Sequence, residues 1–269
     1  MFGGHDREIK DGDRLSLAEK CVLARLCTLR DGPKCSALCG SYIALHGHNG
    51  EGGRIGNSNL PVAYRLITLD NSPARTEQSE IYGSLAVYVR TFARQFGDAA
   101  EPIKSLYLYS RAPGTGKTTT AAALLSEWIT AHYVGSLRRG KQPLDRPAYF
   151  LDVNAWQTDY NEFNRPRVPE HIAEPAAARY YAARQKAIAT PFAVLDDIGV
   201  REPTEGFRAD LHSVINARVT AGLPTVYTSN VPLDELHTVF GERRLADRIR
   251  DLCMEFTFKG ESKRGMRKT

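Results

Sequence analysis

The chain has 269 residues, of which 42% are hydrophobic and 25% are charged, a balance typical of a globular protein that can hold more than one domain. No apolar run is long enough to cross a bilayer, and the first residues lack the apolar stretch of a signal peptide. We therefore expect a cytoplasmic protein with no membrane partner. The formal net charge of +5 is mild, and it suits either an anionic partner or a solvated basic tail.

Residues 1–75 are rich in glycine and turn signals, and they hold most of the cysteines. Four of the five cysteines lie close together: Cys21, Cys27, Cys35 and Cys39. In a cytoplasmic protein such crowding indicates a metal before a disulfide, and these thiols could hold a structural zinc ion. A continuous helix over 16–28 would separate Cys21 from Cys27, so His46 or His48 could be the fourth ligand instead. Buried reduced thiols and an iron–sulfur cluster are the alternatives.

The rest of the chain alternates between helical and strand patterns. Ile81, Leu85, Val89 and Phe92 recur near helical spacing, which predicts an amphipathic helix over 77–96. Five later runs read as strands: 105–110, 148–153, 192–197, 224–228 and 255–258. Strands that alternate with helical segments predict a parallel sheet with helices on its faces.

The strand at 105–110 leads through a glycine-rich turn into a helix. Backbone N–H groups from Gly114 to Lys117 can surround a phosphate at the helix N-terminus, where the helix dipole favours negative charge. The Lys117 ammonium would reach the β- and γ-phosphates of ATP or ADP, and the Thr118 hydroxyl would ligate Mg²⁺. The predicted nucleotide-binding residues here are Pro113, Gly114, Thr115, Gly116, Lys117, Thr118 and Thr119. Arg111 departs from the motif, which asks for glycine at that position.

Two further strands lead to polar side chains. Asp196 and Asp197 end an apolar strand, a pattern typical of the Walker B element of phosphate-loop proteins. Asp196 would hold Mg²⁺ through water, and Asp197 would orient or deprotonate the attacking water. Asn230 follows the next strand and could sense the γ-phosphate, although in isolation it reads as the start of a turn before a proline. The phosphate loop upstream favours the catalytic interpretation of all three.

Arginines are concentrated near the C-terminal end, at Arg243, Arg244, Arg248 and Arg250. A protruding arginine could complete the nucleotide site of a neighbouring subunit by neutralising charge in the transition state. Ordinary ion pairs with Glu242, Asp247 and Asp251 explain any single one of these arginines equally well.

In their order along the chain, these motifs resemble DnaC/DnaI-type helicase loaders, which are AAA+ ATPases related to the IstB transposition helpers. The resemblance covers about 105–264 and rests on five segments: 113–118, 195–199, 228–230, 244–249 and 260–264. It implies that Asn230 is sensor 1, that Arg248 is the arginine finger, and that Arg264 replaces the family's terminal Ser-x-Arg arginine. The N-terminal cysteines are similar to the helicase-binding domain of the DnaI branch, and the layout is similar to phage-encoded loaders. Asp197 stands where many AAA+ ATPases have glutamate, which could slow hydrolysis without preventing binding.

Residues 154–167 mix aromatic, amide and arginine side chains. This composition fits single-stranded DNA, because bases stack on aromatic rings and cations contact phosphates. Trp156, Tyr160 and Phe163 also recur at helical spacing, which indicates the apolar face of a packed helix. The DNA-binding interpretation therefore depends more on Arg165 and Arg167.

The sequence predicts an α/β protein of the AAA+ P-loop NTPase class. It divides into a zinc-binding, helicase-binding module (1–75), a linker helix (76–104) and an ATPase domain (105–269). We expect Mg²⁺-dependent ATP hydrolysis, assembly into a homo-oligomer on ATP and DNA, and delivery of a replicative hexameric DNA helicase to single-stranded DNA. The alternatives are an IstB-like transposition helper ATPase and a nucleotide-gated adaptor with negligible turnover.

Overall fold

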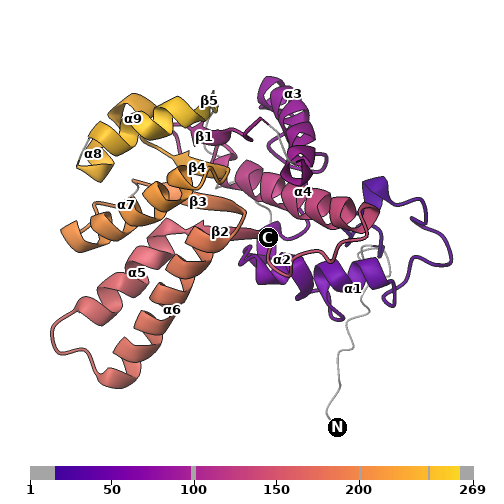
Figure 1. The fold of residues 1–269 in the computed structure, drawn as a ribbon, viewed down its shortest axis with the longest axis horizontal. Helices are drawn as coiled ribbons and strands as arrows, with labels where there is room; N and C mark the ends of the chain where they lie inside the picture. The colour runs from indigo at the N-terminus through magenta and orange to yellow at the C-terminus, as the bar shows by residue number, and fades with distance from the viewer. Residues whose placement is uncertain (1–15, 98–100, 200, 242, 261–269) are drawn as a thin grey trace, which may run out of the picture.

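The computed structural model describes residues 16–97, 101–199, 201–241 and 243–260, which form a five-stranded parallel sheet flanked by helices (Figure 1). The strands are β1 (Ser105–Tyr109), β2 (Ala148–Asp152), β3 (Phe192–Ile198), β4 (Thr225–Ser229) and β5 (Cys253–Thr257). They are ordered β2-β3-β4-β1-β5, and every neighbouring pair is parallel. Each strand lies within two residues of its predicted range, so the predicted α/β class is confirmed.

The α-helices precede and connect the strands. They are α1 (Gly40–His46), α2 (Gly53–Asn57), α3 (Ser79–Tyr88), α4 (Lys117–Arg138), α5 (Val153–Asn164), α6 (Glu170–Ala189), α7 (Glu205–Thr220), α8 (His237–Phe240) and α9 (Arg243–Leu252). The predicted helix at 77–96 is α3 continued by a 3₁₀ helix over Val89–Phe96. The helix considered for 16–28 is wrong, since only Ala24–Leu26 form a 3₁₀ turn there. No helix in the described ranges is both long and apolar enough to cross a membrane.

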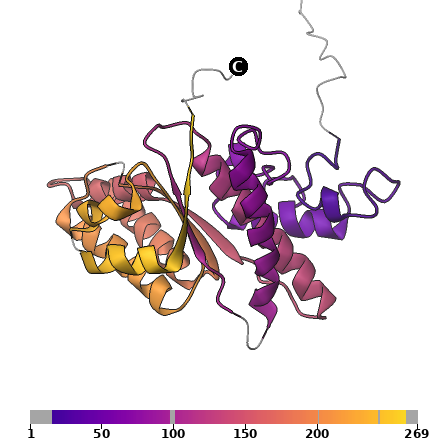
Figure 2. The same cartoon turned by 90° about the horizontal axis from the view of Figure 1, so that it is seen from above.

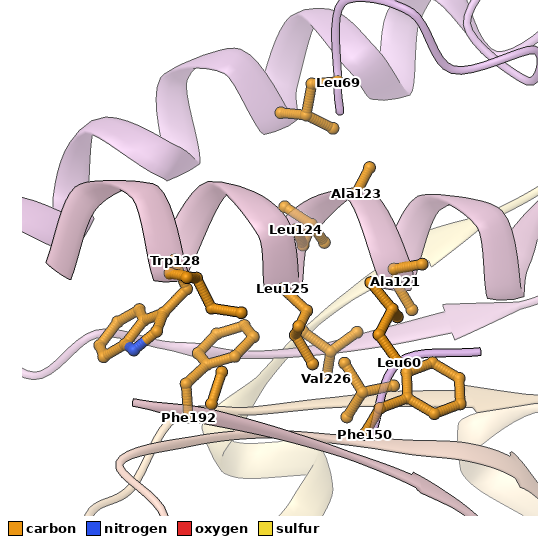
Figure 3. Close-up of a cluster of buried hydrophobic side chains, with 14 of the residues drawn as sticks. Leu60, Leu69, Ala121, Ala123, Leu124, Leu125, Trp128, Phe150, Phe192 and Val226 are labelled. Atoms are coloured by element: carbon orange, nitrogen blue, oxygen red, sulfur yellow. The ribbon is translucent and has the colours of Figure 1, made fainter. Parts of the chain in front are cut away.

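Two layers of helices enclose the sheet, as Figure 2 shows. One face carries α3, α4 and the N-terminal residues, and the other face carries α5 to α9. Helix α4 is buried along five consecutive residues, 121–125, which places apolar side chains on every side of it. In Figure 3, Leu69 lies on the side of α4 away from the sheet, while Phe192 and Val226 lie on the sheet side. The N-terminal chain is therefore the outer cover of the helix that follows the phosphate loop.

Polar contacts attach this N-terminal chain to the rest of the fold. The buried Arg54 guanidinium donates to the carbonyl oxygens of Ala44 at 2.8 Å, Pro143 at 3.0 Å and Leu144 at 2.9 Å. Arg25 forms an ion pair with Glu127, a buried carboxylate on α4. Residues on both sides of position 75 thus belong to one hydrophobic core. The amino-acid composition changes near this position, but the packing of the side chains is continuous across it.

Candidate functional site

The loop between β1 and α4 has the backbone conformation of a phosphate-binding turn. Gly114 and Gly116 have φ values of 75° and 100°, which lie in the left-handed region that favours glycine. A Cβ on Gly116 would also lie 2.5 Å from the Cβ of Ala74, so the N-terminal chain packs directly against the loop. The buried Thr115 hydroxyl has no hydrogen-bond partner among the described residues. A loop of this shape, with an unsatisfied buried hydroxyl, fits an anionic ligand.

The Lys117 ammonium is buried at the start of α4 and is held by three oxygen atoms. It donates to Oδ1 of Asn230 at 2.6 Å and to the carbonyl oxygens of Ser110 and Ala112, each at 3.3 Å. The fold therefore brings together two predicted site residues from the ends of β1 and β4. Phosphate oxygens could replace these neutral acceptors, because a charge-assisted bond to an anion is stronger.

Asp196 lies at the end of β3 and is buried. It accepts a hydrogen bond from Oγ1 of Thr228 at 2.6 Å, and the Thr118 hydroxyl also bonds to it. Burial, and secondarily the neighbouring Asp197 carboxylate, raise the pKa of Asp196 to about 7. A nearby divalent cation would favour the ionised form of this carboxylate. The predicted pair of magnesium ligands, Thr118 and Asp196, is therefore in contact.

Asp197 has a strained backbone. Its φ is 61°, which is uncommon for a residue other than glycine, and the register of β3 against β4 shifts between Leu195 and Ile198. The Asp197 N–H donates to Oγ1 of Thr228 at 2.8 Å, which fixes this conformation. Backbone strain of this kind is concentrated at functional sites, where the surrounding structure maintains it.

Sequence reasoning missed two residues that organise the site. Thr228 donates to the Asp196 side chain and accepts from the Asp197 backbone. Thr228 lies near the end of β4, two residues before Asn230, and this position could have indicated a role in the site. Gln78 donates to the carbonyl oxygen of Lys259 at 2.6 Å and to that of Thr115 at 3.4 Å. No sequence pattern indicates this bridge, since its partners are distant along the chain.

Arg111, the departure from the motif, is accommodated outside the loop. Its Nε donates to the Tyr109 hydroxyl at 3.1 Å, and its guanidinium lies 3.8 Å from the Glu235 carboxylate. The Arg111 side chain is exposed, and its φ is not in the left-handed region. Glycine is therefore not required at this position for the loop to form.

Of the two site arginines predicted in the C-terminal part, Arg248 lies within the described residues and Arg264 does not. Arg248 is exposed on α9 and donates to Oδ1 of Asn216 on α7. Helix α9 lies on the face of the sheet opposite α4, so the Arg248 side chain does not join the cluster around Lys117 (Figure 2). Arg264 lies outside the described residues.

The aromatic side chains of α5 are part of the core. The Trp156 ring stacks on Tyr180 at 4.8 Å and meets Phe207 edge-on at 4.9 Å. This confirms the interpretation of a packed helix face. Arg165 and Arg167 are exposed in the turn that joins α5 to α6, at the end of the hairpin in Figure 1.

The four N-terminal cysteines surround one small cavity of about 30 Å³, which Arg30 and Lys34 also line. All four are free thiols. Within the described residues, however, no group of three His, Cys, Asp or Glu side chains is arranged to hold a metal ion. His46 is not at the cavity: its Nε2 accepts from the N–H of Val22 at 3.2 Å, and its ring stacks on Tyr42. Of the three candidates for a fourth ligand, Cys21 lines the cavity with the other cysteines, whereas His46 and His48 are not among its lining residues.

Residues 171–269 match the family described as IstB-like ATP binding protein. No curated protein matches the chain significantly. Among solved structures, the DnaC helicase loader aligns with 20% identity and a TM-score of 0.52, over 74% of this chain and 100% of that chain. DnaI aligns with 18% identity and a TM-score of 0.48, over 73% and 90%. AMPPCP-bound DnaA from Aquifex aeolicus aligns with 14% identity and a TM-score of 0.48, over 74% and 51%.

The family match and the alignment to the DnaC helicase loader agree with the resemblance found in the sequence. That alignment shows that the chain shares the α/β fold of the loader. The IstB-like match covers the segment that contains Asp196, Asn230 and Arg248. The resemblance to IstB-related AAA+ proteins of the DnaC/DnaI type is thereby confirmed at the level of fold.

Proposed function

We propose that this protein is an ATP-dependent helicase loader that delivers a replicative hexameric helicase to single-stranded DNA. One observation carries the nucleotide part: Lys117, Asn230 and Asp196 converge where β1, β3 and β4 end, the edge at which parallel sheets bind ligands. The fold shared with the DnaC helicase loader supports the loading part.

Each residue of this edge has a separate role in the proposed ATPase reaction. Lys117 would exchange its neutral oxygen partners for the β- and γ-phosphates, which would release Asn230 to face the γ-phosphate or the attacking water. Thr118 and Asp196 would hold Mg²⁺, which would neutralise charge on the phosphates. Asp197 would accept the proton of that water, and Thr228 would keep its backbone in place.

Arg248 would complete the site of a neighbouring copy in a homo-oligomer. Its exposure, on a helix that lies on the other face of the sheet from α4, supports a role in trans. Arg248→Ala should bind ATP as a monomer like the parent but lose stimulated hydrolysis by on the order of 10³-fold. Mixing this variant with Lys117→Ala should restore some activity, because a mixed pair contains one intact site. Retention of stimulated ATPase by Arg248→Ala alone would exclude the role.

The cysteine-lined cavity is proposed to hold a structural zinc ion through Cys21, Cys27, Cys35 and Cys39. Four thiols are a donor set that suits zinc, and the adjacent Arg30 and Lys34 would favour the thiolate forms. Zinc binding would draw the four sulfur atoms closer than they are in this structure. We propose that the zinc-bound region, within 1–75, forms the contact with the helicase.

The turn between α5 and α6 is proposed to contact single-stranded DNA. Arg165 and Arg167 are exposed there, at the end of a hairpin that extends from the sheet (Figure 1). Cations at the tip would contact phosphates, which positions a strand without reading its bases, and the stacked rings of Trp156 and Tyr180 are buried. The match to IstB-like ATP binding proteins supports a second candidate function, that of a transposition helper that assembles on duplex DNA.

One experiment tests loading directly. The chain is mixed with a purified hexameric replicative helicase and ATP, and transfer of the helicase to single-stranded DNA is measured. Lys117→Ala is the control for ATP dependence, and Arg165→Ala/Arg167→Ala is the control for the DNA contact. Loss of transfer in both variants is expected. No binding to the helicase, together with ATP-dependent assembly on duplex DNA, would reject the loader and favour the transposition helper.

A further inference from the structure

A cavity of about 300 Å³ lies between α7 and α9, on the face of the sheet opposite α4. It is lined by His212, Asn216, Arg244, Leu245 and Arg248. Two guanidinium groups and an imidazole contribute to the wall, and among the described residues no carboxylate lines it. A cavity of this composition attracts an anion.

Two carboxylates of α9, Asp247 and Asp251, lie within one or two turns of these arginines. Asp247 pairs with Arg250 at 2.7 Å, and Asp251 forms no ion pair with another described residue. Within the described part of the chain, neither Arg244 nor Arg248 forms an ion pair. The positive charge of both arginines is therefore available to a ligand from outside.

Asn216 holds Arg248 without cancelling its charge. Its Oδ1 accepts one N–H of the guanidinium, which leaves the remaining donors of the group for phosphate oxygens. A carboxylate at this position would hold the arginine more strongly but would neutralise it. An amide oxygen therefore fits a residue that must be oriented and remain cationic.

Helix α7, which carries Asn216, is itself firmly anchored. Val214 and Ile215 are fully buried, and the buried Arg218 donates to Oγ1 of Thr225 and to the carbonyl oxygens of Ala187, Thr190 and Pro224. The amide oxygen of Asn216 thus extends from a rigid support. Supporting a functional side chain in this way reduces the entropy lost when it binds its target.

We propose that Asn216 is the residue that positions Arg248, at this cavity, for the triphosphate of a second copy of the chain. Arg244 supplies a second positive charge on the same wall. The inference rests on the proposed role of Arg248 in trans and adds the residue that orients its guanidinium. The site is incomplete without the second copy, because the cavity contributes cations but no phosphate-binding loop.

Asn216→Leu and Asn216→Gln provide the test, measured with the full chain as DNA- or helicase-stimulated hydrolysis. Asn216→Leu removes the acceptor at similar size, and it should lower stimulated kcat by about 10-fold or more, since a hydrogen bond to a charged group is involved. Asn216→Gln keeps an amide oxygen and should retain part of the lost rate. ATP affinity of the monomer and the thermal midpoint Tm should match the parent in both.

A double-variant cycle separates positioning from a general structural effect. In the Arg248→Ala background, Asn216→Leu should cause no further loss of kcat, because the positioned group is already absent. If Asn216→Leu lowers Tm, then Asn216→Asp is measured instead, and it should abolish stimulation by neutralising Arg248. If the Asn216 variants keep the kcat of the parent while Arg248→Ala is inactive, this inference is overturned, but the proposed role of Arg248 in trans still stands. Full activity of Arg248→Ala would instead reject the role in trans itself.

Discussion

The carboxyl edge of the sheet and the cysteine-bearing segment 16–39 differ in what holds their polar side chains. At the edge, Lys117 reaches Asn230 and Asp196 reaches Thr228, contacts that join separate strands. In segment 16–39, the backbone N–H group of each cysteine donates to a carbonyl only three residues earlier, as from Cys35 to Gly32. The edge is therefore fixed by the sheet, whereas the segment is built from local turns.

This difference predicts how each region depends on its ligand. Side chains at the edge are already close to the geometry that a nucleotide needs, so binding should change few of their positions. The cysteines share one cavity but are not arranged as metal ligands, so a bound ion would supply most of the order. The predictions below test this contrast, beginning with the largest expected effect.

Removal of zinc should affect segment 16–39 most strongly. We expect about one zinc per chain in protein purified without chelators, with binding energy on the order of 10 kcal/mol that becomes folding energy of the segment. A strong chelator should speed hydrogen exchange in 24–39 while α4 and the buried side of 40–74 stay protected. Cys27→Ser/Cys35→Ser is the matched variant. Protein with no stoichiometric metal would contradict the zinc proposal.

Substitutions at the carboxyl edge should separate binding from turnover. Lys117→Ala should weaken ATP binding, because it removes the cation that faces the phosphates, whereas Asp197→Asn should leave binding largely intact. Asp197→Asn should lower kcat by about 10²- to 10⁴-fold, the usual contribution of a general base. Isothermal titration and single-turnover hydrolysis measure the two quantities. An equal loss of ATP affinity in both variants would contradict this division of roles.

The sequence predicted the edge better than the segment for a physical reason. The strands, and the polar side chains that follow them, have short-range patterns that can be recognised in the sequence. In a parallel sheet the carboxyl ends of neighbouring strands lie side by side, so Lys117 and Asn230 come together whatever the length of the chain between them. Thr228 and Gln78 were missed because their roles depend on contacts across the fold. In place of the helix considered for 16–28, the backbone forms turns with mostly three-residue hydrogen bonds, while Val22 and Leu23 join the core that packs on α4.

Acid should destabilise the N-terminal chain through His46. Burial lowers the pKa of His46 from 6.5 to about 4, and its Nε2 accepts a hydrogen bond in the neutral form. The unfolded chain therefore takes up a proton near pH 6.5 that the folded chain does not, and stability falls as the pH drops from 6.5 to 4. The loss should approach about 3 kcal/mol.

Urea unfolding at several pH values measures this effect. His46→Gln should remove about that much of the pH-dependent loss of stability between pH 6.5 and 4. An unchanged slope in His46→Gln would mean that this imidazole is solvated in the folded chain.

The smallest effect is expected at the ion pair that joins the segment to α4. Arg25→Ala leaves the Glu127 carboxylate buried with one remaining donor, the N–H of Leu69. A fully buried pair broken in this way costs about 3–5 kcal/mol, but the Arg25 side chain is 37% exposed, so we expect about 1–3 kcal/mol. Arg30→Ala, which breaks the exposed pair with Asp31, is the control and should change stability by less than about 1 kcal/mol.

The pH dependence identifies the cause of the Arg25→Ala effect. Burial raises the pKa of Glu127, and the Arg25 guanidinium opposes that rise. A raised folded-state pKa means that stability is lost as the pH rises through it, so removing Arg25 should cost more at pH 8 than at pH 4.5. Glu127→Gln in the Arg25→Ala background should abolish this difference, because no buried charge remains. A cost that is equal at both pH values would assign the effect to lost packing of the arginine stem.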